Sequence, residues 1–109
     1  MHPKNMDFVM VITTCSSQEE AERLASVLVA ERLAACAQVS GPIASVYWWK
    51  GDLEKDMEWQ VKFKMPSKNF QKACDTIKQN HSYEVPQIVS VRIDGVLPEY
   101  ADWLIKETK

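Results

Sequence analysis

The residues best suited to chemistry lie in one short segment, residues 81–87. This segment brings together an imidazole at His81, a phenol at Tyr83 and a carboxylate at Glu84. A histidine can bind a metal ion or move a proton near neutral pH, and a nearby carboxylate can share either task. We therefore predict His81 and Glu84 as metal ligands. The alternative is structural: a histidine at a helix end, followed by a rigid turn before a strand.

A strand predicted over residues 57–65 carries a second pair of charged residues. Its odd-numbered residues are apolar and its even-numbered residues are polar, as in a strand with one buried side. The predicted core side consists of Met57, Trp59, Val61, Phe63 and Met65. Glu58 and Lys64 share the other side, which is either solvent-exposed or, if a neighbouring subunit covers it, part of a polar pocket.

Four bulky residues stand together at positions 46–49, with the sequence Val-Tyr-Trp-Trp. On a strand they place large side chains on both sides. One explanation is a core strand covered by helices, since aromatic residues are common in strands. The explanation we favour is a long hairpin that extends beyond the domain and packs on another subunit, because an exposed apolar edge would otherwise promote aggregation.

The cysteines Cys15, Cys36 and Cys74 have no CxxC spacing and predict neither a disulfide framework nor a conventional zinc site. Cys36 and Cys74 suit small buried positions, whereas Cys15, next to a predicted helix start, could bind a soft metal. No Ser/His/Asp or Cys/His arrangement has a recognisable spacing, and a chain with three glycines has no glycine-rich phosphate loop. We therefore predict that the protein is not an enzyme.

The composition is that of one ordinary globular domain. The chain has 109 residues, of which 46% are hydrophobic and 26% charged. With a net charge of -2 and scattered lysines, it lacks the basic patch that nucleic acids require. No stretch approaches the ~20 apolar residues that cross a bilayer, and the first residues lack the apolar segment of a signal peptide. We expect a tail at residues 1–7, a single domain at 8–109, a cytoplasmic location, and no nucleic-acid or membrane partner.

The pattern of apolar residues predicts an α+β domain of ferredoxin-like type. The predicted elements, in order, are a strand at 8–12, a helix from Ser16 or Ser17 to about Ala34, a long strand at 36–49 with a bulge or bend at 40–42, a strand at 57–65, a helix at 67–80 closed by Asn80 in the left-handed conformation, a strand at 88–93, and a helix from Pro98. This βαββαβ order with an added C-terminal helix gives a sandwich with an antiparallel sheet, in which the first and third strands are central.

Three segments resemble the CutA family of divalent-cation tolerance proteins. They are Glu31-Arg32-Leu33-Ala34-Ala35-Cys36-Ala37, Ser45-Val46-Tyr47-Trp48-Trp49-Lys50-Gly51 and His81-Ser82-Tyr83-Glu84-Val85-Pro86. Lys64 and Trp103 also fit the family pattern, and the resemblance extends from Phe8 to Leu104. Some relatives have a cysteine where this chain has Thr13, and paired histidines where it has Asn80-His81.

The resemblance implies a homotrimer in which the long hairpin reaches a neighbouring subunit. It also implies a role in divalent-cation tolerance, with copper as the cation and no obligatory cofactor. The family's architecture is similar to that of the PII signalling proteins, so the alternative function is a trimeric sensor or scaffold that binds a small organic ligand between subunits. The expected interface pocket consists of Tyr47, Trp49, Glu58, Lys64, His81, Tyr83, Glu84 and Trp103.

Overall fold

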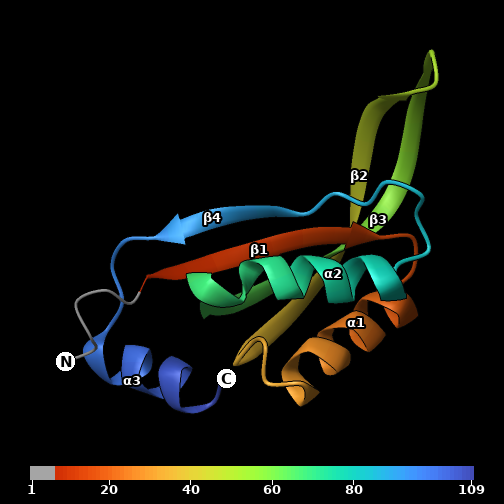
Figure 1. Cartoon of the computed structure of the whole chain (residues 1–109). Helices are drawn as coiled ribbons and strands as arrows, with labels where there is room; N and C mark the ends of the chain where they lie inside the picture. Colours follow the sequence, from red (N-terminus) through yellow and green to blue (C-terminus); the bar gives the residue numbers. More distant parts are fainter. Residues whose placement is uncertain (1–6) are drawn as a thin grey trace.

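The predicted order of elements is confirmed in the computed structural model, which describes residues 7–109 (Figure 1). Nearly all of the expected N-terminal tail lies outside these described residues. The elements are β1 (Phe8–Cys15), α1 (Gln18–Ala30), β2 (Cys36–Trp49), β3 (Asp52–Pro66), a 3-10 turn (Ser67–Asn69), α2 (Phe70–Asn80), β4 (Val89–Ile93) and α3 (Pro98–Lys106). The fold is α+β and ferredoxin-like.

The four strands form one antiparallel sheet in the order β2-β3-β1-β4, so β1 and β3 are central as predicted. α1 and α2 cover one face of this sheet (Figure 1). Val11 of β1 packs in the core beneath them, while Phe8 packs against Ala101 and Leu104 of α3. Because side chains alternate along a strand, α3 covers one end of the opposite face.

Most of the core lies between the sheet and the two covering helices. Its largest fully buried side chains include Phe63, Leu24, Leu28, Met65 and Ile77. Burying a side chain of this size stabilises the fold by roughly 1.5–3 kcal/mol. This burial is the main force that holds the helices to the sheet. Cys36 and Cys74, predicted at small buried positions, are only partly buried.

α1 begins where the sequence predicts and ends earlier. The Ser17 Oγ accepts a hydrogen bond from the Glu20 backbone N–H at 3.1 Å and caps the helix. The helix ends at Ala30, not near Ala34, because Arg32 takes a left-handed conformation with φ of 63°. The Leu33 N–H then bonds to the Leu28 carbonyl at 3.1 Å, as in a Schellman motif. This turn places Leu33 in the core.

α2 also ends differently from the prediction. Asn80 is the last helical residue, and the positive-φ residues other than glycine among residues 7–109 are Arg32 and Lys50. The Asn80 side-chain amide instead donates to the Thr76 carbonyl at 2.8 Å. His81 follows in an extended conformation, with φ of -97°. The chain therefore leaves α2 directly toward the N-terminal end of α1.

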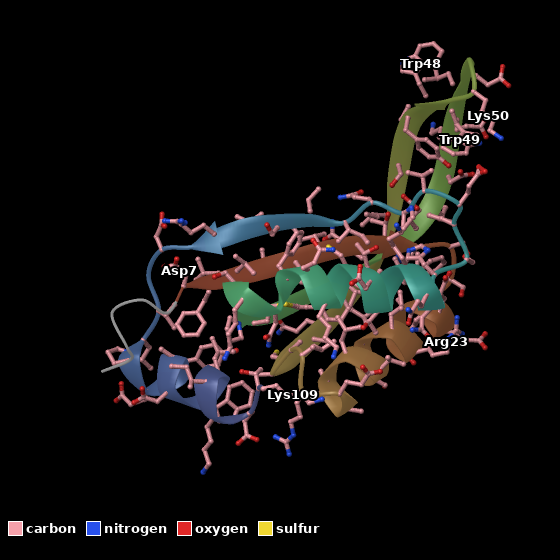
Figure 2. The ribbon with its side chains drawn as sticks, in the orientation of Figure 1. Asp7, Arg23, Trp48, Trp49, Lys50 and Lys109 are labelled. Carbon is pink, nitrogen blue, oxygen red and sulfur yellow. The ribbon has the colours of Figure 1, made fainter. Side chains whose placement is uncertain are left out.

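β2 and β3 continue past the helices as a projecting hairpin, which we call the hairpin arm (residues 43–58; Figures 1 and 2). The predicted irregularity in β2 is confirmed as a register shift between Ser40 and Ile43. β3 starts at Asp52, earlier than the predicted residue 57. Met57, predicted in the core, is 54% exposed because no described helix lies over this part of the strand.

The hairpin arm has two chemically different sides. Cross-strand partners lie on the same side of a sheet, and the register pairs Trp48 with Leu53 and Tyr47 with Glu54. The apolar side carries Ala44, Val46, Trp48, Leu53 and Met57, together with Lys55. The polar side carries Ser45, Tyr47, Trp49, Asp52, Glu54, Asp56 and Glu58, together with Ile43 at its base. Trp48 is 72% exposed at the end of the arm (Figure 2).

Candidate functional site

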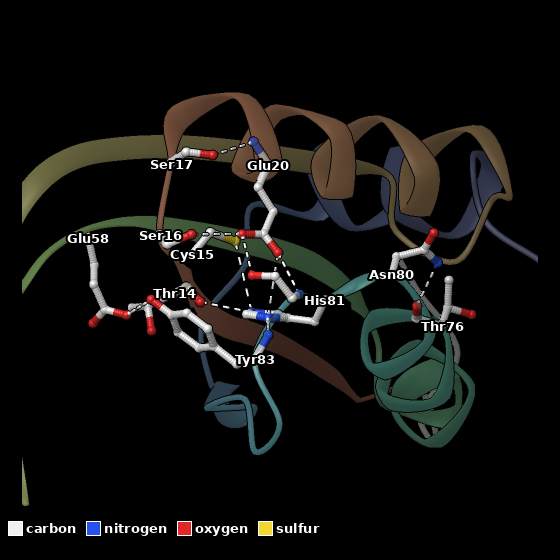
Figure 3. Close-up of polar contacts among 11 residues, drawn as sticks. Thr14, Cys15, Ser16, Ser17, Glu20, Glu58, Thr76, Asn80, His81 and Tyr83 are labelled. Carbon is white, nitrogen blue, oxygen red and sulfur yellow. Dashed lines mark hydrogen bonds and ion pairs between the residues drawn. The ribbon is translucent and has the colours of Figure 1, made fainter. Parts of the chain in front are cut away.

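His81 lies in a buried group of side chains between the end of β1 and the start of α1 (Figure 3). Its imidazole is fully buried, with Nε2 at 3.9 Å from Cys15 Sγ and Nδ1 at 3.7 Å from Glu20 Oε2. The ligand atoms of Cys15, Glu20 and His81 all lie within 4.8 Å of one another. We call these three residues the ligand group. Among residues 7–109 it is the one cluster of at least three such side chains with this spacing.

Three elements converge to form the ligand group. Cys15 is the last residue of β1, and Glu20 is in the first turn of α1, just after the Ser17 cap. His81 follows the last residue of α2. The sheet and its covering helices therefore fix the group, since each residue sits at the end of a packed element.

The hydrogen bonds of His81 define its tautomer. The Tyr83 backbone N–H can only donate, and it donates to His81 Nδ1 at 3.1 Å. In the neutral ring the hydrogen is therefore on Nε2, which donates to the Thr14 carbonyl at 2.8 Å. Both ring nitrogens are engaged, so a metal ion at His81 must replace one of these bonds.

Glu20 holds the start of the following loop. Its carboxylate accepts hydrogen bonds from the Ser82 N–H at 2.7 Å and the Ser82 hydroxyl at 3.0 Å. Burial alone would raise the pKa of Glu20, but the two hydrogen bonds from Ser82 outweigh burial and hold this pKa below its usual value. The residue is therefore a carboxylate at neutral pH.

Cys15 is a neutral thiol in this environment. Burial is the main cause that raises its pKa to about 12, and the negative charges of Glu20 and Glu58 add to it. A bound cation would reverse this balance, because metal coordination favours the thiolate. The group is thus suited to a metal ion and poorly suited to a free nucleophilic thiolate.

A hollow of about 700 Å³ lies beside the ligand group, between the loop after His81 and the polar side of the hairpin arm. Its lining consists of Thr14, Ser45, Val46, Tyr47, Trp49, Glu58, Ser82, Tyr83, Glu84, Val85, Pro86 and Gln87. The Tyr83 hydroxyl donates to Glu58 Oε2 at 2.6 Å, which joins the loop to the arm (Figure 3). The Tyr47 hydroxyl donates to the Asp56 carboxylate, a bond that raises the pKa of Tyr47 to about 12.

Five of the eight residues expected in an interface pocket line this hollow. They are Tyr47, Trp49, Glu58, Tyr83 and Glu84. His81 lies behind it, in the ligand group. Lys64 and Trp103 lie away from the hollow, and both are near Tyr100. The Lys64 Nζ is 5.8 Å from the Tyr100 ring centroid, and the Trp103 ring centroid is 5.4 Å from it.

Glu84, expected beside His81 as a metal ligand, does not belong to the ligand group. Its carboxylate is 3.8 Å from Lys50 Nζ, and its side chain is 70% exposed. Cys15 and Glu20 take its place next to His81. The sequence offered a signal for Cys15 as a soft ligand, whereas Glu20, three residues after Ser17, only fits the capping-box pattern of a helix start. Neither pattern could pair them with a histidine more than 60 residues away.

The described helices are all too short or too polar to cross a membrane. Fold and site together define a ferredoxin-like α+β protein with a buried Cys/Glu/His group of metal-ligand type. The chain belongs to the family of CutA1 divalent ion tolerance proteins, whose model matches residues 9–107.

Individual relatives agree with this assignment. The divalent-cation tolerance protein CutA of Pyrococcus horikoshii is 38% identical over 101 residues, covering 93% of this chain and 98% of the relative. The chloroplastic protein CutA 1 of Oryza sativa is 33% identical over 93% of this chain, which spans only 57% of that longer relative. The crystal structure of CutA1 from Oryza sativa superposes with a TM-score of 0.92 at 32% identity, with 94% of each chain covered.

Proposed function

We propose that this chain is a homotrimeric divalent-cation tolerance protein that binds a metal ion, copper or a chemically similar cation, at Cys15, Glu20 and His81. The observation that carries the proposal is the ligand group, whose three donor atoms lie within 4.8 Å of one another. Thiolate and imidazole ligands suit copper and zinc. We propose no catalytic role and no obligatory cofactor. The free thiols of the three cysteines support a reducing compartment, for which we propose the cytoplasm.

The proposed site is a weak one for physical reasons. A metal ion must displace the proton of the Cys15 thiol, whose pKa is raised to about 12. It must also compete with the hydrogen bonds that Glu20 makes to Ser82 and that His81 makes to Thr14. Metal affinity should therefore increase with pH, and binding should loosen the start of the loop.

Metal titration by calorimetry under anaerobic conditions tests this site. We expect zinc and cuprous ion to bind the wild type, and Cys15→Ala to reduce affinity at least tenfold, because it removes the thiolate ligand. Cys74→Ala is the matched control, since Cys74 lies on α2 outside the ligand group. Equal affinity of the wild type and Cys15→Ala would contradict the proposal.

Two apolar surfaces support the proposal of a homotrimer. Val89 and Val91 of β4 are 44% and 47% exposed, and their β1 partners Ile12 and Met10 are only partly buried. The apolar side of the hairpin arm is the second surface. Surfaces of this kind usually mark an interface. The number of subunits is an expectation from the family resemblance.

Sedimentation velocity tests the assembly. Val91→Glu places a charge on the open sheet face, and we expect it to shift the protein toward a smaller species because the buried charge would lack a partner. Val29→Glu, at an exposed valine on α1, is the matched control and should leave the mass unchanged. A monomeric wild type would contradict the proposal.

The hollow supports a second proposed role, as a sensor or scaffold that binds a small organic ligand. Its volume of about 700 Å³ is within the range of small-molecule sites. In the proposed trimer this hollow would lie near a neighbouring subunit, because the arm that forms one wall also carries the apolar side. A thermal-shift screen of metabolites tests the role, and no stabilising ligand would count against it.

A further inference from the structure

Glu58 is a buried carboxylate without a cationic partner among residues 7–109. It is 6% exposed and lines the hollow. Its one hydrogen-bond partner in this part of the chain is the neutral hydroxyl of Tyr83, at 2.6 Å from Oε2. Burying a carboxylate without a positive charge is costly. The hollow gives a ligand access to this carboxylate, so a cation bound there would offset the cost.

The walls of the hollow favour an organic cation. Tyr47, Trp49 and Tyr83 line it and provide aromatic surface next to Glu58. Aromatic faces attract ammonium groups through the quadrupole of the ring, and this attraction strengthens when the cation is partly desolvated. Apolar ring surface also accommodates an alkyl chain. An anion is disfavoured, because the polar side of the arm carries the four carboxylates of Asp52, Glu54, Asp56 and Glu58.

The chain itself places an ammonium group at the rim of the hollow. Lys50, in the turn of the hairpin arm, has its Nζ at 5.4 Å from the Trp49 ring centroid and 3.8 Å from Glu84 Oε2. Trp49 and Glu84 both line the hollow, and Figure 2 shows Lys50 next to Trp49. The Lys50 side chain is 71% exposed. At the rim, an ammonium group therefore already contacts an aromatic ring and a carboxylate. Glu58 itself has no cationic partner among residues 7–109.

The hollow is less suited to a metal ion. Successive carboxylates on one side of a strand are about 7 Å apart along the chain, whereas a metal ion needs several ligands at short range. Within the described chain, three donor side chains converge at Cys15, Glu20 and His81 and not on the arm. An ammonium group needs only one carboxylate and neighbouring aromatic faces.

We propose that the hollow binds a small alkylammonium ion, with its charge on Glu58 and its alkyl chain against Tyr47 and Trp49. This inference rests on the second proposed role, the binding of an organic ligand in the hollow, and names the class of ligand. It does not depend on the metal site.

Calorimetry with three probes of equal chain length tests the inference on the full chain: butylammonium, butyrate and butanol. We expect butylammonium to bind at least tenfold more tightly than the other two. Glu58→Gln should weaken butylammonium binding at least tenfold, because the amide carries no charge. Lys50→Met should strengthen it several-fold, because it removes the ammonium group that occupies the Trp49 ring at the rim of the hollow. Asp75→Asn, on α2, is the control for the change in net charge and should have no effect.

The outcomes separate this inference from the proposals on which it builds. Butyrate or butanol binding as tightly as butylammonium would overturn the amine class while keeping a ligand in the hollow. If neither the wild type nor the Glu58→Gln variant binds any of the three probes, the inference is overturned, and the result also counts against the ligand role. Loss of assembly in Glu58→Gln without amine binding to the wild type would also overturn it, because the carboxylate would then pair with a second copy. Cys15→Ala should bind butylammonium as the wild type does.

Discussion

The two halves of β3 follow the same alternating pattern but differ in what covers them. Phe63 in the inner half is fully buried, whereas Met57 in the outer half is 54% exposed, although alternation places both on the same side of the strand. α1 and α2 cover the inner half, and no described helix covers the hairpin arm (Figure 1). Alternation therefore shows on which side a residue lies, while burial depends on the neighbouring elements.

The largest expected effect comes from the pair that defines this comparison. Phe63→Ala should reduce the free energy of unfolding by about 3–5 kcal/mol, because it leaves a cavity in the core. Met57→Ala should cost less than about 1 kcal/mol within the protomer, since no cavity forms. Urea denaturation at several protein concentrations measures both.

Concentration distinguishes the two halves further. The loss caused by Phe63→Ala should be the same at every concentration. If the arm packs on a second copy, Met57→Ala should reduce the free energy of unfolding by more than about 1 kcal/mol at high protein concentration. This excess should disappear when dilution separates the subunits. A loss for Met57→Ala that equals that of Phe63→Ala at all concentrations would contradict the comparison.

The junction and the end of the arm should also respond differently to the loss of a glycine. Gly41 has a φ of 152°, and a Cβ there would lie 2.7 Å from Trp59 Cδ1 and 3.0 Å from the Glu58 carbonyl oxygen. Gly51 has a φ of 87° with open space around it. Gly51→Ala should cost about 1–2 kcal/mol from backbone strain alone. Gly41→Ala should cost more, about 3 kcal/mol, because the strain and the close contacts add.

Thermal unfolding of the two alanine variants side by side measures this difference. The same reduction in Tm for both variants would show that β2 does not approach Trp59 closely at Gly41.

A smaller, pH-dependent effect tests how Glu20 of α1 holds the loop that follows His81. The pKa of Glu20 is lower in the folded protein than its usual value, so Glu20 stabilises the fold above about pH 4.3. This contribution is lost as the pH falls through the folded pKa. Glu20→Gln should cost about 1.5–3 kcal/mol at neutral pH, because the amide cannot accept both bonds from Ser82.

The difference in Tm between the wild type and Glu20→Gln should shrink as the pH falls toward 3, as followed by circular dichroism. Glu22→Gln is the matched control, since Glu22 lies on the same helix and its carboxylate bonds to the exposed Gln18 side chain. A difference that stays constant with pH would mean that Glu20 acts through its shape and not through its charge.

Much of the fold could be predicted because its signals are local. The Ser17 cap, the alternation around Phe63 and the irregularity at residues 40–42 each depend on neighbours within a few residues. The predicted end of α1, near Ala34, was wrong because the sequence from Glu31 to Ala34 is compatible with a helix. Burial of Leu33 and Ala34 against the core favours the left-handed turn at Arg32 instead, a tertiary effect that overrides helix propensity.

The candidate site could be predicted only in part. The importance of the segment from His81 to Glu84 was visible because three reactive side chains are close together in the sequence. The partners of His81 were not visible, since Cys15 and Glu20 come from the other end of the chain. The sequence instead favoured Glu84, three positions away, which points to Lys50 on the hairpin arm.

The family, the order of the elements and the side of each strand on which a residue lies could all be predicted from the amino-acid sequence. Motifs and periodicity contain this information, because they depend on residue types at short spacing. The convergence of Cys15, Glu20 and His81, and the burial of Glu58 at the base of an exposed arm, became visible only in the folded chain. Contacts of this kind depend on how distant elements pack, and the packing of β1, α1 and α2 against one another brings the three ligand atoms together.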